Sequence, residues 1–279
     1  MMSVQRLNRG IGIRQIIALL LMPLLLLAGF SLPGFAFAEI SSYAQAVNKA
    51  GAQRMLTQRI SKAYNLKRLA EIGLVAAPNN FDRELKEAIA LFETQLLELK
   101  KFNKQPQVAE LIQRVDADWS EFRDLALSSF SVENAEKLWR SDEKLLLHCE
   151  AVMQQMLDDS GTIIDRYVNI SGRQRMLSQR ISKYYMLNAV GIERASMREF
   201  SEQARNEFSG ALSRLQQAEE NSSVITARLE EVSLQWRWLV GALDLSDQPQ
   251  FPIIVNDASD KTLRLMHQIT GFYELLANQ

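Results

Sequence analysis

The amino-acid sequence predicts an all-α protein in which an N-terminal signal peptide precedes two tandem up-down-up-down four-helix bundles. Apolar residues recur at helical spacing of three and four along the chain, and no stretch alternates as a strand does. The 279 residues include only 6 prolines and 12 glycines, so long helices can run without interruption. A long repeated segment predicts the two bundles, and a basic segment followed by an apolar one at the N-terminus predicts the signal peptide.

Residues 1–38 have the three parts of a secretory signal peptide. Residues 1–14 carry three arginines and no acid, residues 16–30 are apolar, and residues 36–38 read Ala-Phe-Ala. Cleavage after Ala38 would leave a chain with a net charge of −4 in the periplasm. An uncleaved segment that anchors the protein in the membrane is the alternative, since the apolar run approaches the about 20 residues that span a bilayer.

The rest of the chain contains one unit twice. The segment Val47–Tyr64 returns 121 residues later as Val168–Tyr185, with 13 of 18 positions identical and no gap. Weaker echoes follow in the same order, with Phe92 and Trp119 recurring as Phe208 and Trp236. We therefore expect two domains of ordinary size, residues 39–159 and residues 160–279.

Each unit reads as four helices of roughly 20 to 30 residues. The breaks between helices are expected at residues 78–80, 105–106 and 128–133 in the first unit, and at residues 191–196, 221–223 and 246–252 in the second. Pro106 suits the first position of a helix. Short connections of this kind make successive helices antiparallel, which gives the up-down-up-down bundle.

Several classes of function are excluded by composition. One cysteine and two histidines cannot form an ordinary zinc site, and no phosphate loop or nucleophile motif is present. We therefore expect no metal, no cofactor and no enzymatic activity. With a net charge of −1 and no basic block, nucleic acid is not an expected partner. Cys149 is interpreted as a buried filler, and His148 and His267 as ordinary helix-face histidines.

The repeated segment carries a polar stripe that differs from its apolar face. At 3.6 residues per turn, the stripe contains Asn48, Gly51, Met55, Gln58 and Lys62, with Arg54 at its edge. A glycine within a helix costs about 0.5–1 kcal/mol relative to alanine, so a partner helix or a small ligand is expected close to Gly51. Arg54 and its repeat Arg175 offer planar forks of donors that suit an oxyanion.

These residues carry a family resemblance. The segments Asn48-x-x-Gly51-x-x-Arg54-Met55-Leu56 and Gly172-Arg173-Gln174-Arg175-Met176-Leu177 resemble the signature helix of the PilJ-type domain. This domain is the N-terminal sensory domain of type IV pili methyl-accepting chemotaxis transducers, and it is related to the periplasmic P-box domain of nitrate/nitrite sensor kinases. The resemblance implies that glycines and arginines of two paired helices enclose a small anion, with nitrate or nitrite favoured.

Carried over by position, the resemblance gives a set of candidate ligand contacts. They are Gly51, Arg54, Gly172 and Arg175, with Asn48, Lys49, Asn169 and Arg173 as further members. Lys49 is repeated as Ile170, and Ala52 stands where the second unit has Arg173, so the two half-sites would be chemically unequal.

The expected function is that of a periplasmic sensory module that captures the anion and communicates with a membrane-bound receptor, kinase or transporter. The alternative is a ligand-free helical scaffold linked to pilus or chemoreceptor assembly, in which the stripe packs against another helix.

The junction of the two units leaves two arrangements open. A tight turn at 158–161 would set Arg54 and Arg175 side by side and give one site per chain. A helix running unbroken from about Asp142 to Tyr185 would separate the two arginines, and a paired site would then need a homodimer.

Overall fold

The computed structural model describes residues 39–75, 78–102, 105–192, 194–244 and 251–279, and within these ranges it contains helices and no strand. The predicted signal peptide at 1–38 lies outside the described residues. In the described part of the chain, no helix combines the length and the apolar character needed to cross a membrane. Residues 39–279 form one unit with a shared hydrophobic core.

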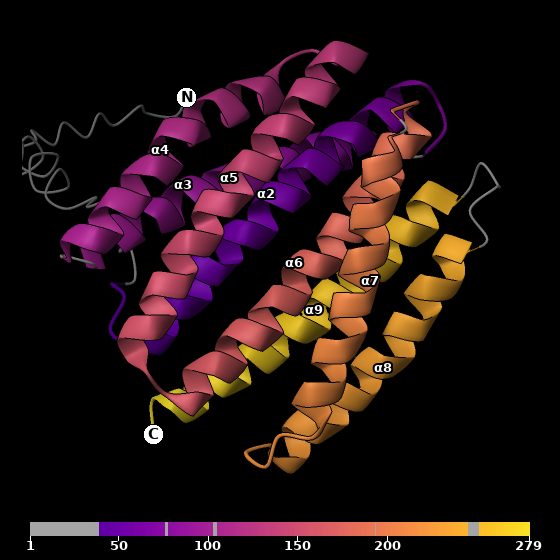
Figure 1. The fold of residues 1–279 in the computed structure, drawn as a ribbon. Coiled ribbons are helices and arrows are strands. Elements are labelled where there is room, and N and C mark those ends of the chain that lie inside the picture. Colours follow the sequence, from indigo (N-terminus) through magenta and orange to yellow (C-terminus); the bar gives the residue numbers. More distant parts are fainter. Residues whose placement is uncertain (1–38, 76–77, 103–104, 193, 245–250) are drawn as a thin grey trace, which may run out of the picture. The chain divides into compact units, whose positions relative to one another are not determined.

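The all-α prediction is confirmed, with eight helices in the described ranges (Figure 1). They are α2 (Tyr43–Glu71), α3 (Pro78–Phe102), α4 (Pro106–Leu127), α5 (Val132–Ser160), α6 (Ile163–Ala189), α7 (Ala195–Gln216), α8 (Ser223–Asp244) and α9 (Phe251–Ala277). Pro106 opens α4 as predicted. The expected break at 78–80 is wrong, because α3 begins at Pro78, where the fixed φ of proline suits the first turn of a helix.

The junction of the two halves is the tight turn and not the continuous helix. α5 ends at Ser160, and Gly161 adopts a left-handed conformation with φ of 67°, which glycine reaches without a steric penalty. The Thr162 side chain then accepts a hydrogen bond from the backbone N–H of Asp165 at 3.0 Å, which caps the start of α6. The chain therefore reverses direction between α5 and α6.

Both halves have the same internal arrangement. α2 packs against α3 and α5, and α4 packs against α5. In the second half α6 packs against α7 and α9, and α8 packs against α9. The same aromatic pair stabilises each core: Phe92 stacks on Trp119 and Phe208 stacks on Trp236, each with ring centroids 3.9 Å apart. These buried pairs confirm that the echoes in the sequence mark equivalent core positions.

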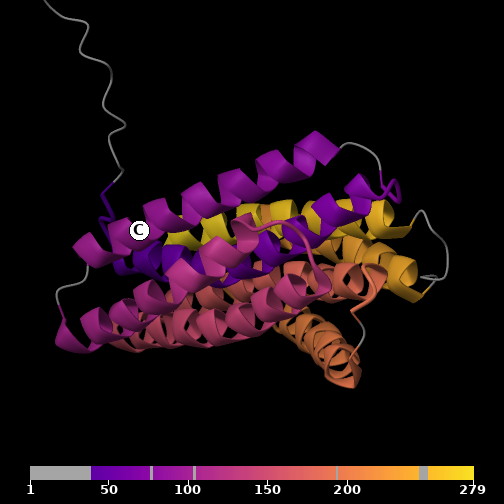
Figure 2. The same ribbon diagram turned by 90° about the horizontal axis from the view of Figure 1, so that it is seen from above.

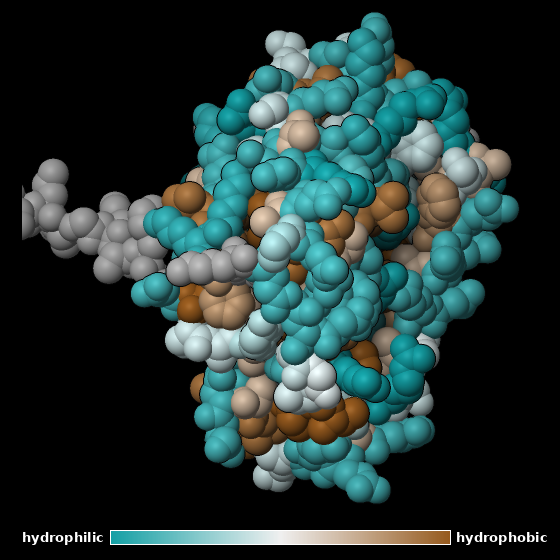
Figure 3. Space-filling view, turned by 60° about the vertical axis from the view of Figure 1, so that its left-hand side comes forward, coloured by the Kyte–Doolittle hydropathy of each residue, from teal (hydrophilic) through white to brown (hydrophobic). Residues whose placement is uncertain are grey.

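The two halves meet along α2 and α6, which run side by side in the same direction (Figures 1 and 2). Each of these two helices is covered by its own bundle on one side and by the other helix on the other. This explains why most of their side chains are buried, whether apolar or polar. By contrast, the outer face in Figure 3 is mostly hydrophilic, with small scattered apolar areas.

Candidate functional site

The polar stripe of the repeated segment lies between α2 and α6. Its members Gly51, Gln58 and Lys62 on α2, with Gln179 and Lys183 on α6, are buried. The helix that approaches the glycine-bearing stripe of one repeat is thus the corresponding helix of the other repeat in the same chain. Buried polar groups need partners, and those partners form two layers along the helix pair.

The first layer contains the two arginines of the motif, the two glycines, Asn48 and Asn169. We call these six residues the arginine layer. Arg54 is 0% exposed and Arg175 is 1% exposed. A Cβ atom at Gly172 would lie 3.0 Å from Nη2 of Arg175, and one at Gly51 would lie 3.2 Å from Nη2 of Arg54. The glycines are therefore needed because each guanidinium folds back over the helix turn that precedes it.

The two arginines converge on one place. A Cβ atom at Gly51 would also lie 3.9 Å from Nη2 of Arg175, which belongs to the other repeat. Arg54 donates from Nη2 to Oδ1 of Asn169 at 2.9 Å, and Arg175 donates from Nη2 to Oδ1 of Asn48 at 2.7 Å. The two bonds are reciprocal, so each repeat supplies an arginine and receives one.

The two halves of the arginine layer differ in their remaining partners. Nη1 of Arg54 donates to the Glu150 carboxylate at 2.7 Å, and that carboxylate also pairs with Arg173 at 2.9 Å. Nη1 of Arg175 lies 3.2 Å from Nδ1 of His267. Within the described residues Arg175 forms no ion pair, and its contacts are to the neutral imidazole and to Asn48.

Burial and like charge shape the electrostatics of this layer. Burial lowers the pKa of Arg54, and burial together with the charge of Arg54 lowers the pKa of Arg175 to about 10. The Arg175 guanidinium therefore stays protonated at neutral pH. Burial opposes ionisation of Glu150, but Arg54 and Arg173 outweigh it and hold the pKa of this carboxyl below its usual value. The Nε atoms of Arg54 and Arg175 are buried without a hydrogen-bond partner.

The remaining predicted contacts lie at the edge of the layer or outside it. Lys49 points to α3, where it pairs with Glu98 at 2.6 Å, and so does not join the arginines. Arg173 pairs with Glu207 on α7 and reaches the layer through Glu150. The structure thus brings together Gly51, Arg54, Gly172, Arg175, Asn48 and Asn169, with Arg173 adjoining and Lys49 apart.

The second layer lies about two helical turns along α2 and α6, and we call it the lysine layer. Lys62 donates to Asp260 of α9 at 2.6 Å, and Lys183 donates to Asp142 of α5 at 2.8 Å. Each of these ion pairs joins the two repeats. Gln58 donates to Asp142 at 2.9 Å, which gives that carboxylate a second buried donor.

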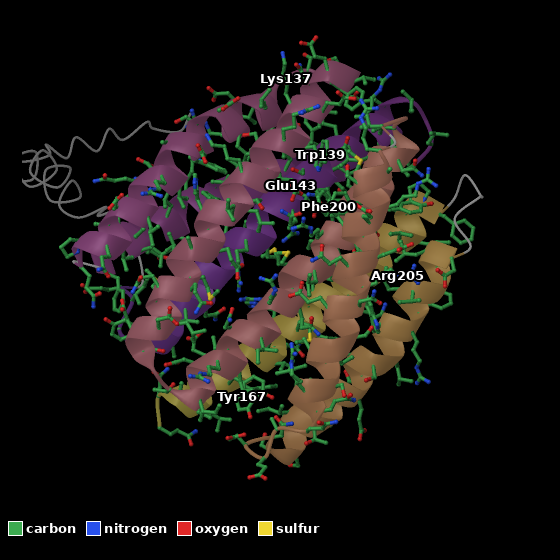
Figure 4. All side chains as sticks on the ribbon, in the orientation of Figure 1. Lys137, Trp139, Glu143, Tyr167, Phe200 and Arg205 are labelled. Atoms are coloured by element: carbon green, nitrogen blue, oxygen red, sulfur yellow. The ribbon has the colours of Figure 1, made fainter. Side chains whose placement is uncertain are left out.

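Cations hold two carboxylates of the lysine layer ionised, Glu143 and Asp260, whereas burial raises the pKa of Asp142 in spite of Lys183 beside it. Glu143, labelled on α5 in Figure 4, accepts from Lys183 at 2.7 Å and from Arg180 at 2.7 Å. Burial opposes ionisation of this carboxyl, but Lys183 and Arg180 lower its pKa to about 2. At Asp260, Lys62 likewise outweighs burial and lowers the pKa. Each charge in this layer has a direct opposite partner.

Sequence reasoning missed the lysine layer, Glu150 and the contact of His267 with Arg175. A signal for the lysine layer was present, because the dipeptide Ser-Asp occurs at 141–142 and again at 259–260, in corresponding positions of the last helix of each repeat. These acids face lysines that are themselves repeated. Glu150 has no acidic counterpart in the second repeat, so no repeat signal marked it.

The arrangement can bind but offers little for covalent chemistry. In the described part of the chain, no group of three or more His, Cys, Asp or Glu side chains is placed to hold a metal ion. Burial raises the pKa of the Cys149 thiol, which keeps it protonated and a poor nucleophile. Two buried guanidinium forks and two amides are suited to a small planar oxyanion.

The fold and the site define a tandem helical domain in which the two motif helices pair within one chain. The family model described as Type IV pili methyl-accepting chemotaxis transducer N-term (PilJ) matches residues 35–156 and 164–260. The chain belongs to this family, whose members are sensory N-terminal domains of transducers, typically periplasmic and not catalytic. No curated protein and no solved structure gave a significant match to the chain.

Proposed function

We propose that this protein is a periplasmic sensory module that captures one small oxyanion per chain in the arginine layer, with nitrate or nitrite the favoured ligands. Residues 39–159 and 160–279 would act as the two domains that each supply a half-site. The signal would pass to a membrane-bound receptor, kinase or transporter.

One observation carries the proposal: two fully buried arginines of like charge converge above Gly51, and Arg175 forms no ion pair with any carboxylate of the described residues. Two unit charges about 4 Å apart at an effective dielectric constant of 20 repel by about 4 kcal/mol, so burying such a pair is costly. A bound anion removes this cost by accepting hydrogen bonds from both forks.

The same contacts suggest how binding is transmitted. Asn48 accepts from Arg175 and donates to Glu274 of α9. Asn169 accepts from Arg54. An anion that takes over donors of the two arginines competes with these asparagines. Binding would therefore change the contacts that join α2 to α9 at this end of the helix pair.

Thermal unfolding with added anions tests the proposal. The purified protein is unfolded alone and with millimolar sodium nitrate, nitrite, sulfate, or small carboxylates. A ligand at 100 times its dissociation constant adds about 2.7 kcal/mol, which raises the midpoint by about 5–10 °C at this chain length. We expect a selective rise with nitrate or nitrite.

Arg175→Gln provides the variant and Arg228→Gln the matched control. Arg175→Gln removes the unpaired guanidinium and should abolish the rise. Arg228 pairs with Glu231 on the exposed face of α8, so its replacement should leave the rise unchanged. No shift with any anion, or an equal shift in Arg175→Gln, would contradict anion capture in this layer.

A ligand-free scaffold is the second candidate, and the lysine layer favours it. The buried pairs Lys62–Asp260 and Lys183–Asp142 join the repeats without any ligand. In this case Arg175→Gln would change the size of an assembly with partner proteins and leave anion titrations flat. Size-exclusion chromatography of the two arginine variants distinguishes the candidates.

A further inference from the structure

His267 stands at the solvent side of the arginine layer. It lies on the exposed face of α9, and its Nδ1 atom is 3.2 Å from Nη1 of the buried Arg175. Asp142 and Asp260 have the same role in the lysine layer. When the two repeats are aligned on these aspartates, His267 corresponds to Cys149. Cys149 is buried, so only the second half-site has a titratable ring that connects its arginine with solvent.

The contact fixes the protonation state of the ring. A guanidinium has donors and no acceptor, so Nδ1 of His267 must be the acceptor and the proton of the neutral ring is on Nε2. Protonation of Nδ1 would remove this hydrogen bond and place two cations together. In agreement, burial and the charge of Arg175 lower the pKa of His267.

The charges around the layer balance without a ligand. The cations are Arg54, Arg173 and Arg175, and the carboxylates are Glu150, Glu207 and Glu274. A monovalent anion bound between the two buried arginines lowers their mutual repulsion, but it gives this wider, partly exposed group one excess negative charge. One further positive charge restores the balance, and histidine is the side chain that gains one near neutral pH.

We propose that His267 is a ligand contact and that a monovalent oxyanion enters the arginine layer together with one proton, which His267 takes up. The proton comes from solvent and binds Nδ1. The resulting N–H of His267 donates to an oxygen of the anion. Arg175, which donated to Nδ1 of His267 before, donates to the anion instead. One negative charge and one positive charge enter, so the balance of the layer is kept.

Few other groups act on this ring. The charge of Arg175 on α6 lowers the pKa of His267, and the charge of Glu274, on α9 like His267 itself, raises it. α2 contributes the neutral amide of Asn48, which bonds to both of these residues. No charged side chain of α8 in the described residues acts on the imidazole. The balance between Arg175 and the entering anion therefore decides its protonation.

Calorimetric titration of the purified protein with sodium nitrate tests this inference, which rests on the proposed anion binding. Titrations at pH 5.5, 6.5 and 7.5 use pairs of buffers with different ionisation enthalpies, so that proton uptake is read from the heat. We expect uptake that approaches one proton per anion just above pH 6.5. Affinity should fall as pH rises, by up to about tenfold per pH unit.

The two histidines of the chain give a variant and its control. His267→Gln should still bind nitrate, with neither proton uptake nor pH dependence. His148 pairs with Asp118 at 2.7 Å and lies away from the arginine layer. His148→Gln should therefore bind nitrate with the same proton uptake and pH dependence as the unsubstituted protein.

Three results separate the inferences. Nitrate binding with proton uptake that is lost only in His267→Gln supports both. Nitrate binding without uptake, or with uptake that persists in His267→Gln, overturns the role of His267 and leaves anion capture standing. If neither nitrate nor nitrite binds the original chain, the proposed function fails and this inference fails with it.

Discussion

The lysine layer and the arginine layer occupy the same helix pair but treat buried charge in different ways. In the lysine layer each cation meets a carboxylate of the other repeat, at 2.6 Å for Lys62 and 2.8 Å for Lys183. In the arginine layer each arginine instead donates to an asparagine of the other repeat, and within the described residues Arg175 forms no ion pair. In the lysine layer every charge has a partner, whereas in the arginine layer the Nε donors of Arg54 and Arg175 have no hydrogen-bond partner within the described residues.

Under the proposed function, the lysine layer contributes stability and the arginine layer contributes recognition. A completed set of buried ion pairs fixes how two helices meet, because removing any member leaves a charge without a partner. Buried donors without an acceptor lower the free energy of unfolding when no ligand is bound. An anion that accepts their hydrogen bonds would raise it again. The two layers should therefore respond differently to substitution.

The largest effect is expected from Lys183→Met. The change leaves Asp142 buried with no cation beside it and removes a partner of Glu143, so we expect a loss of about 3–5 kcal/mol in the free energy of unfolding. Urea unfolding followed by circular dichroism measures it. Lys137→Met is the control: Lys137 lies on α5 (Figure 4) and pairs with the exposed Glu133, so its replacement should leave the free energy of unfolding almost unchanged. Equal losses would mean that the lysine layer does not hold the repeats together.

A smaller effect should separate the two arginines. Without an anion, Arg54→Gln removes one cation from the half-buried Glu150 and should cost about 1–3 kcal/mol. Arg175→Gln removes a like charge that has no ion pair, so it should cost less. Urea unfolding of both variants in a chloride-free buffer makes the comparison. A greater loss for Arg175→Gln would reverse the asymmetry described for the layer.

Glycine substitutions should give effects near 1 kcal/mol. Gly172→Ala places a methyl group 3.0 Å from Nη2 of Arg175, so the guanidinium must move and nitrate should stabilise the variant less. At Gly210, within α7, an added Cβ meets nothing within 4 Å. Gly210→Ala should therefore gain about 0.5–1 kcal/mol and keep the nitrate response, because alanine suits a helix better. Thermal unfolding with and without nitrate reads both; matching responses would show that the glycine does not position Arg175.

The smallest effect concerns pH. Because the folded protein lowers the pKa of His267, the unfolded chain binds more protons below pH 6.5, and stability without an anion should fall as pH drops through that range. His267 is only partly covered, and solvent screens its interaction with Arg175, so the fall should stay below about 1 kcal/mol. In His267→Gln this part of the fall should vanish between pH 7 and 5.5. Parallel stability curves for the two proteins would contradict the coupling of His267 to Arg175.

The fold was predictable because its signals are local. Helical spacing, Pro106 and the turn residues up to Gly161 act within a few neighbours, and the repeat of Val47–Tyr64 announces two similar bundles. The prediction failed at Pro78, where a residue that often ends helices begins one. Whether Ser160 and Gly161 would turn depended on a single backbone conformation, which the sequence permitted but did not require.

The site was only partly predictable because its partners are distant in the chain. The motif alone predicts that Gly51 and Arg54 lie close together on one helix, and Gly172 and Arg175 on the other, since helical spacing decides that. It could not predict that Lys62 would meet Asp260, because no local rule relates side chains so far apart. Lys49 was misplaced for the same reason, since Glu98 on the neighbouring helix draws it away.

The turn at Gly161 has a consequence for how such a site can change over time. In a symmetric dimer of identical chains, each substitution appears in both half-sites at once. Here the half-sites are encoded separately, so Glu150 stands beside Arg54 while the opposite arginine keeps an imidazole. With both repeats in one chain, each half-site can change on its own, and an ion bound between them would meet two different neighbours.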